Sequence, residues 1–197
     1  MRGAGRLAVG WLLSGALGLG AVAGAAEKVG VTRLSSNGNY GVRFTELDGG
    51  GCKLDALRDT QVAWTLSGCV GTVDDVYLIA DSGNRLWVLF TLPEEKAAPK
   101  GPPPADSGRR TRRAMTDRAP FSRVTVAKLM DRTGKVLQQK TLQDLIGPRG
   151  RDKVRQLGRH FKWLGGVSGV AGNSPRVNEH NQVELETIDL RKLQLDF

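Results

Sequence analysis

The stretch that most constrains this chain's fold is Val76–Leu92, which reads VYLIADSGNRLWVLFTL. Two apolar, β-rich runs flank a short polar segment that contains Gly83 and Asn84, residues that tolerate the backbone conformation of a tight hairpin turn. The second run, Leu86–Phe90, is apolar on both faces, which is typical of a strand covered on both sides. The pattern predicts a β-hairpin with a central second strand, and we expect Asp81 to hydrogen-bond the turn backbone.

A second stretch, Val126–Leu142, repeats this pattern at an offset of 50 residues without gaps. Asp131 matches Asp81, Lys135 matches Arg85, and apolar positions follow in both copies. Looser echoes occur at residues 48–54 and 189–193. One interpretation is an array of related hairpins, arranged like the blades of a small β-propeller. The other is that Asp-Gly-basic turns are ordinary hairpin chemistry that recurs by chance.

Apolar residues alternate with polar ones in several other short segments, and this period of two indicates half-buried strands. Strands are predicted at residues 40–45, 52–57, 61–66, 183–188 and 192–197. Leu142–Ile146 is predicted to be a short helical turn, and residues 165–181 a loop. Residues 149–164 fit both a helix and a strand, because the helical spacing of apolar residues is weakened by Gly158. The predicted fold is all-β, an antiparallel, hairpin-rich sandwich or partly open barrel with at most one or two short helices. The alternative is the propeller-like arrangement.

The first residues have the features of a secretory signal peptide. Arg2 and Arg6 precede an apolar run at residues 7–22, and Ala23–Ala25 supply the small residues that signal peptidase requires. We therefore expect residues 1–26 to be removed and the mature chain to be periplasmic or extracellular; an uncleaved membrane anchor is the alternative. Residues 27–197 are long enough for a single β domain with its own core.

The sequence contains two cysteines, Cys52 and Cys69. An even pair in an exported chain predicts one disulfide, which would stabilise the fold by about 3 kcal/mol in the chain-entropy model. Two buried free thiols are the alternative. A C-x-x-C motif does not occur in the sequence, so redox catalysis and a zinc ribbon have no support.

Basic residues are concentrated in two segments. Residues 97–123 carry seven basic and two acidic residues, and residues 149–162 carry six basic and one acidic residue. The first segment lies in a proline-rich stretch, predicted to be a disordered linker at about 94–122 that interrupts the β domain.

Guanidinium and ammonium groups in such clusters attract phosphate and carboxylate polymers. The candidate polyanion-binding residues are Arg109, Arg110, Arg112, Arg113, Arg118, Arg123, Arg155, Arg159 and Lys162. An exported protein would meet an anionic glycan, lipopolysaccharide, a membrane surface or a protein of the envelope, and genomic nucleic acid is not expected as a partner. The competing interpretation is a solvated linker that binds nothing.

Patterns that support catalysis are weak. The two histidines are His160 and His180, and residues 166–170 lack the second glycine of a G-x-S-x-G nucleophile elbow. The acidic pairs at residues 74–75 and 94–95 are adjacent, so on a strand they would point to opposite faces. We predict no catalytic, cofactor-binding or metal-binding residue. The sequence favours a non-catalytic binding or structural module; a weak polyanion or membrane-surface binder is second, and a hydrolase with a site not visible in the sequence is third.

Overall fold

The computed structural model describes residues 28–29, 33–91, 124–147, 150–157 and 160–197. The described part of the chain is nearly all β, with 49% of its residues in strands and 3% in helix, and the sheets there are antiparallel and do not close into a barrel. This confirms the all-β fold class and is consistent with a sandwich. The predicted signal peptide and the predicted linker lie outside the described residues.

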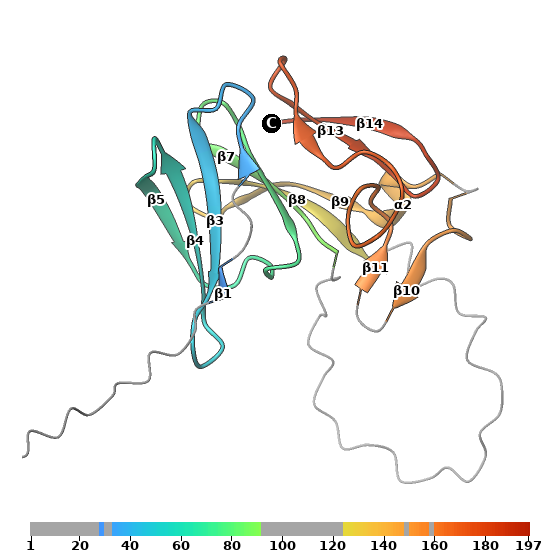
Figure 1. Ribbon diagram of the computed structural model, residues 1–197, viewed down its shortest axis with the longest axis horizontal. Helices are drawn as coiled ribbons and strands as arrows, with labels where there is room; N and C mark the ends of the chain where they lie inside the picture. Colours follow the sequence, from blue (N-terminus) through green and yellow to red (C-terminus); the bar gives the residue numbers. More distant parts are fainter. Residues whose placement is uncertain (1–27, 30–32, 92–123, 148–149, 158–159) are drawn as a thin grey trace, which may run out of the picture.

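The first sheet is formed by the N-terminal strands, at the left of Figure 1. It contains β1 (Lys28–Val29), β2 (Arg33–Leu34), β3 (Tyr40–Glu46), β4 (Cys52–Arg58) and β5 (Gln61–Ser67). The strand order is β1-β3-β4-β5, and β2 pairs with β3 as well. Strands β3, β4 and β5 confirm the strands that the alternation of apolar and polar residues predicts at residues 40–45, 52–57 and 61–66.

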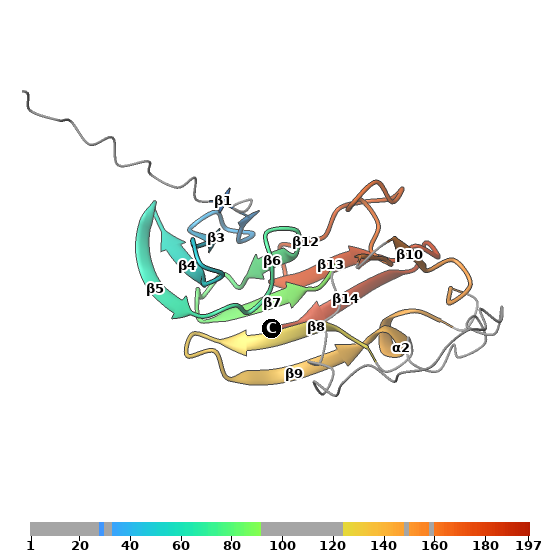
Figure 2. The same cartoon turned by 90° about the horizontal axis from the view of Figure 1, so that it is seen from below.

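The central sheet is built from the two matching hairpins. It contains β6 (Val76–Ile79), β7 (Arg85–Leu89), β8 (Thr125–Asp131) and β9 (Val136–Thr141), in that order. Figure 2 shows these strands side by side. The short helix α2 (Leu142–Leu145) follows β9, as predicted. Because the two clearest copies of the repeat share one sheet, they are not equivalent hairpins of separate blades.

The C-terminal part of the chain forms a third sheet and a separate hairpin. The third sheet has the order β12 (Arg176–Val177), β13 (Gln182–Glu186) and β14 (Lys192–Asp196). The hairpin pairs β10 (Arg155–Leu157) with β11 (His160–Lys162), so the ambiguous segment 149–164 contains strands rather than a helix. The prediction that residues 165–181 form a loop throughout was wrong at β12, which pairs with β13 in register.

The central sheet is covered on both faces, which places the core. On one face, Trp87 and Leu89 belong to a buried cluster with Val183, Leu185 and Leu195 of the third sheet. The other face packs against the first sheet, through a cluster whose central-sheet members are Tyr77, Ile79, Leu86, Val88, Phe90 and Met130. Figure 1 shows β7 and β8 between the first sheet and the strands β13 and β14. The prediction of a central strand at Leu86–Phe90 is therefore confirmed.

The turn between β8 and β9 is held by its own aspartate. The Asp131 carboxylate accepts hydrogen bonds from the Thr133 N–H at 2.8 Å and the Lys135 N–H at 3.1 Å. Gly134 has a φ of 84°, the left-handed conformation that glycine adopts without steric cost.

The turn between β6 and β7 differs, and the expectation for Asp81 was wrong. The Asp81 carboxylate accepts hydrogen bonds from the Ser36 hydroxyl at 2.6 Å and the Asn37 N–H at 3.1 Å, both in the turn that joins β2 to β3 of the first sheet. In the β8–β9 turn, the hydrogen bond that closes the hairpin runs from the Asp131 N–H to the Lys135 carbonyl. In the β6–β7 turn, the corresponding bond runs from the Ala80 N–H to the Arg85 carbonyl. Asp81 therefore lies one residue further into its turn, where its side chain reaches a neighbouring sheet.

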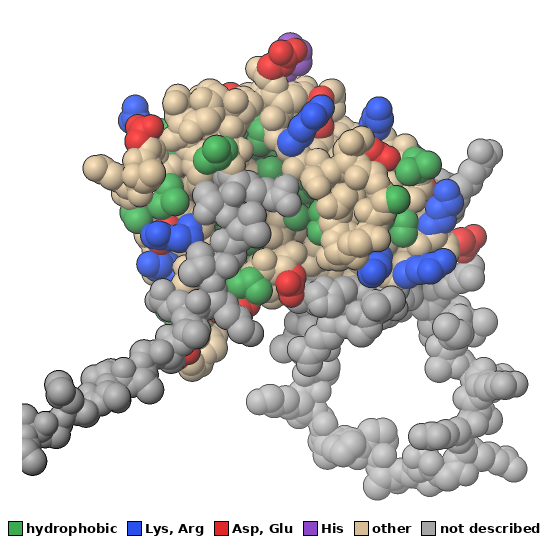
Figure 3. Space-filling view, viewed as in Figure 1, with side chains coloured by type: hydrophobic (Ala, Val, Ile, Leu, Met, Phe, Trp, Pro, Cys, Tyr) green, Lys and Arg blue, Asp and Glu red, His purple; other side chains and the backbone are tan. Residues whose placement is uncertain are grey.

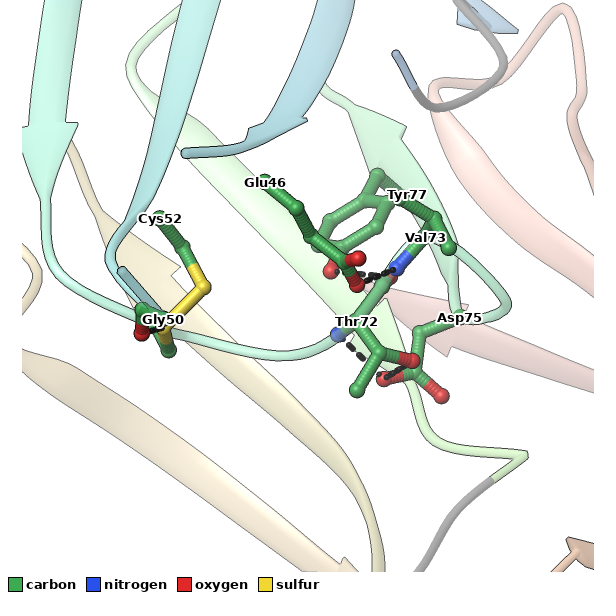
Figure 4. The surroundings of a disulfide bond; sticks show 8 residues. Glu46, Gly50, Cys52, Thr72, Val73, Asp75 and Tyr77 are labelled. Carbon is green, nitrogen blue, oxygen red and sulfur yellow. Dashed lines mark hydrogen bonds between the residues drawn. A yellow bond between two sulfur atoms is a disulfide. The ribbon is translucent and has the colours of Figure 1, made fainter. Parts of the chain in front are cut away.

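Cys52 and Cys69 form the predicted disulfide, so the alternative of two free thiols was wrong. The bond joins the start of β4 to the segment that follows β5, next to the loop at residues 72–75 (Figure 4). In this loop Tyr77 donates a hydrogen bond from its hydroxyl to the Thr72 carbonyl at 2.8 Å, and burial raises the pKa of Tyr77. The same loop is held by Asp75, which accepts from the Thr72 N–H at 2.8 Å.

Candidate anion-binding surface

The β10–β11 hairpin is fixed to one end of the central sheet. The Phe161 N–H donates to the Thr91 carbonyl at 2.8 Å, and Phe161 is buried in the core cluster shared with the third sheet. Trp163, which comes directly after β11, is fully buried and donates from its indole N–H to the Phe90 carbonyl at 2.7 Å. These contacts give the short hairpin a fixed position that two three-residue strands would not maintain alone.

Two basic residues lie opposite each other across this hairpin. Arg155 lies directly opposite Lys162 in the antiparallel register, so their side chains project from the same face. Like charges at directly opposite positions destabilise a strand pair. Two exposed basic residues, Arg151 and Lys153, come just before β10. We call these four residues, Arg151, Lys153, Arg155 and Lys162, the basic surface.

The four cations of the basic surface outnumber the one carboxylate in their stretch of chain, Asp152. Elsewhere, some basic side chains are neutralised by a carboxylate. Arg43 and Lys53 both contact the Asp55 carboxylate, at 2.9 and 3.2 Å, and Arg176 contacts Glu184 at 2.9 Å. The excess of positive charge at the basic surface matters because it stays available to an external anion.

The electrostatic effect of a neutralised pair is clear at Asp55. This carboxylate is 1% exposed, and burial alone would raise its pKa. Hydrogen bonds from Arg43, Thr65 and Lys53 outweigh that effect and hold the pKa below its ordinary value. The stretch of chain that carries the basic surface contains one carboxylate, Asp152, beside its four cations, so the surface keeps a net positive charge.

The described residues that flank the longer basic segment lie near the β10–β11 hairpin. Thr91 and Val124 are the described residues that flank residues 92–123. Thr91 follows β7 and Val124 precedes β8, and between them the Phe90 N–H donates to the Val126 carbonyl at 2.8 Å. Since the Thr91 carbonyl also accepts from the Phe161 N–H of β11, these two flanking residues lie near the hairpin that carries Arg155 and Lys162. In Figure 3, basic side chains gather at the lower right, over the region where Figure 1 labels β10 and β11.

The candidate residues from the sequence have three outcomes. Arg155 and Lys162 are placed side by side, and Cys52 is bonded to Cys69. The remaining candidates, Arg109, Arg110, Arg112, Arg113, Arg118, Arg123 and Arg159, lie outside the described residues. Sequence reasoning did not single out Arg151 and Lys153, although their position just before β10 within the segment 149–162 could have identified them.

A second feature, which the sequence did not indicate, is a hollow over the outer face of the third sheet. It has a volume of about 520 Å³, and we call it the polar hollow. Its lining residues are Asn173, Ser174, Arg176, Glu184, Leu185, Glu186, Lys192, Leu193 and Gln194. Hydrogen bonds from Asn178 and Arg176 lower the pKa of Glu184, which favours its ionised form and disfavours a role as a proton donor.

The two histidines have different outcomes. His180 is exposed and lies 3.7 Å from Glu179, its neighbour in the chain. Nothing is described for the side chain of His160. Within the described ranges, no group of three or more His, Cys, Asp or Glu residues could hold a metal ion.

Comparison with known proteins adds no family: no protein-family model matches the chain, and neither the curated proteins nor the solved structures contain a match. The disulfide is compatible with an oxidising, exported location. Among the described residues, no helix is long and apolar enough to cross a membrane.

Proposed function

We propose that this protein is an exported, non-catalytic binding domain that holds an anionic polysaccharide on its basic surface. The observation that carries the proposal is the pair of cations, Arg155 and Lys162, that the hairpin register places directly opposite each other. A hairpin that places two cations opposite each other loses stability unless an anion joins them. The pair is fixed to the core by Phe161, so the charges are held in position before any ligand arrives.

Export is supported by the disulfide and by the signal-peptide pattern at residues 1–26. A linear anionic glycan suits the site because the basic surface extends along the chain from Arg151 to the hairpin, and the described residues that flank 92–123, Thr91 and Val124, lie near that hairpin. We infer that Arg109, Arg110, Arg112, Arg113, Arg118 and Arg123 add to the same binding event. The affinity would come from many charge-assisted contacts and would therefore fall steeply with salt.

The test uses immobilised heparin, a linear sulfated glycan, as the probe. The double variant Arg155→Gln/Lys162→Gln removes two charges from the basic surface. Its matched control, Arg132→Gln/Lys135→Gln, removes two charges from the exposed turn between β8 and β9, at the opposite end of the central sheet. We expect the first variant to elute at lower salt than both the control and the wild type. The slope of log affinity against log salt should fall by roughly 1 for each contact removed.

Deletion of residues 97–123 should weaken retention further, because it removes seven basic residues. Equal elution of the two double variants would contradict the proposal, since net charge alone would then explain the binding. Retention that does not change with salt would contradict it as well. A parallel sedimentation assay with vesicles of anionic phospholipid separates the glycan from a membrane surface. Vesicle binding that is stronger than heparin binding would replace the polysaccharide with lipid.

A further inference from the structure

We propose that the polar hollow binds a small zwitterionic ligand, with an amine on Glu186 and an acidic group on Lys192. The hollow lies on the third sheet and is separate from the basic surface. Its floor is formed by polar residues that β12, β13 and β14 place in cross-strand rows. Two of these residues, Glu186 and Lys192, lie directly opposite each other.

The first cross-strand row is already occupied by internal contacts. Arg176 donates from Nε and Nη2 to the same oxygen of Glu184, at 3.1 and 2.9 Å. The other Glu184 oxygen accepts from the Asn178 side-chain amide at 3.2 Å. The charges of Arg176 and Glu184 therefore cancel each other, and neither is left for a charged ligand.

Glu186 is different, because it is buried without a cation. Its residue exposure is 9%, and among the described residues no Lys, Arg or His nitrogen lies within 4.0 Å of its carboxylate. Its Oε2 accepts from the Asn173 N–H at 3.3 Å and from the Asn173 side-chain amide at 2.9 Å. No donor to Oε1 is found in the described part of the chain. A buried carboxylate with a free oxygen is costly unless a cation or a hydrogen-bond donor reaches it.

The space beside this free oxygen results from a glycine. Gly172 has a φ of 123°, and a Cβ at this position would lie 3.1 Å from Glu186 Oε1. Any other residue would crowd the carboxylate as well as strain the backbone. The loop thus holds Oε2 of Glu186 through Asn173. Because residue 172 is a glycine, no side chain at this position covers Oε1.

Lys192 supplies the complementary charge at the rim. It is exposed, and it makes neither a hydrogen bond nor an ion pair with any described residue, although it faces Glu186 across the strand pair. A ligand amine would donate a charge-assisted hydrogen bond to Glu186, and a ligand phosphate or carboxylate would accept one from Lys192. A ligand with only one of these charges would leave the other protein group without a partner.

The probe for this proposal is O-phosphoethanolamine, which carries one amine and one phosphate, added to the ¹⁵N-labelled full chain and followed by NMR. We expect saturable shifts of the side-chain amides of Asn173 and Gln194. Ethanolamine and inorganic phosphate, each with only one of the two groups, should bind about tenfold more weakly, as expected when one charge-assisted contact is lost.

Two variants assign the contacts. Glu186→Gln should weaken binding of the probe by about tenfold or more, and Lys192→Gln by severalfold, as expected for loss of a buried and an exposed charge contact respectively. Glu179→Gln and Lys135→Gln are matched controls, because both residues are exposed and lie outside the hollow, and they should bind as the wild type does.

The proposal is overturned if the wild type shows no saturable shift, or if inorganic phosphate alone binds as well as the probe. Wild-type affinity in Glu186→Gln also overturns it. Should Glu186→Gln fail to fold, the exposed Lys192→Gln variant decides the question, and unchanged affinity there contradicts the assignment.

Discussion

The hairpins β6–β7 and β8–β9 share a sequence pattern and a sheet, yet the fold uses them differently. Strand β7 is buried on both faces, whereas β9 is at the edge of the sheet and most of its residues are exposed. The turn of the first hairpin contacts another sheet through Asp81, and the turn of the second is closed on itself through Asp131. Similar local sequences therefore form the same local structure, and their neighbours in space determine how each contributes to stability.

The largest expected difference is between the second strands of the two hairpins. Trp87 is fully buried, and its indole N–H donates to the Asp196 carbonyl at 3.0 Å. Trp87→Ala should lower the free energy of unfolding by about 3–5 kcal/mol through cavity formation, in addition to the lost hydrogen bond. Leu137 on β9 is 39% exposed, so Leu137→Ala should cost no more than about 1 kcal/mol. Urea unfolding measures both, and equal losses would show that β7 is not central to the core.

The turn glycines offer a finer comparison. Gly83 and Gly134 both have positive φ, so alanine adds backbone strain of about 1–2 kcal/mol at either position. At Gly83 a Cβ would also lie 2.3 Å from a ring carbon of Tyr40, whereas at Gly134 the nearest atom is 3.5 Å away, on Leu66. Gly83→Ala should therefore cost about 1–3 kcal/mol more than Gly134→Ala, because Tyr40 must move. Thermal unfolding of the two variants tests this, and the reverse order would contradict the contact between the turn and the first sheet.

The smallest expected effect is the pH dependence of the stability that Asp131 contributes. Hydrogen bonds from the Thr133 hydroxyl and N–H lower the pKa of Asp131 in the folded state. Since an unfolded aspartate titrates near about pH 3.9, its contribution is fully present above that pH and is lost as the pH falls through the lower folded value. The stability difference between wild type and Asp131→Ala should thus be present at neutral pH and shrink in strong acid.

A local measurement completes this comparison. At neutral pH, Asp131→Ala should shift the NMR signals of Thr133 and Lys135 within its own turn. Asp81→Ala should instead shift Ser36 and Asn37 in the first sheet. Shifts confined to the mutated turn in both variants would mean that Asp81 does not connect the sheets.

The sequence predicted those parts of the fold that depend on neighbouring residues. Alternation identified the longer strands, the apolar run at Leu86–Phe90 identified the central strand, and a single cysteine pair identified the disulfide. The partner of Asp81 could not be predicted, because Ser36 and Asn37 come close only when two sheets pack.

The candidate sites divide in the same way. Clustering of basic residues identified Arg155 and Lys162, but their direct opposition depends on the register of a hairpin whose periodicity is ambiguous in the sequence. The polar hollow could not be found by pattern, since Asn173, Glu186 and Lys192 come from a loop and two strands. No short motif contains these residues together.

The adjacency of Thr91 and Val124 has a consequence for engineering and for evolution. The pairing of β7 with β8 reaches Leu89 and Ala127, and a further hydrogen bond joins Phe90 to Val126. The packed core therefore fixes the positions of Thr91 and Val124, which lie close together, and not the length of the chain between them. The chain that joins them can change in length at a small entropic cost, about 0.6 kcal/mol for each doubling of a flexible connection. This position can therefore accept a foreign peptide or a whole domain, displayed next to the basic surface, while the three packed sheets keep their contacts.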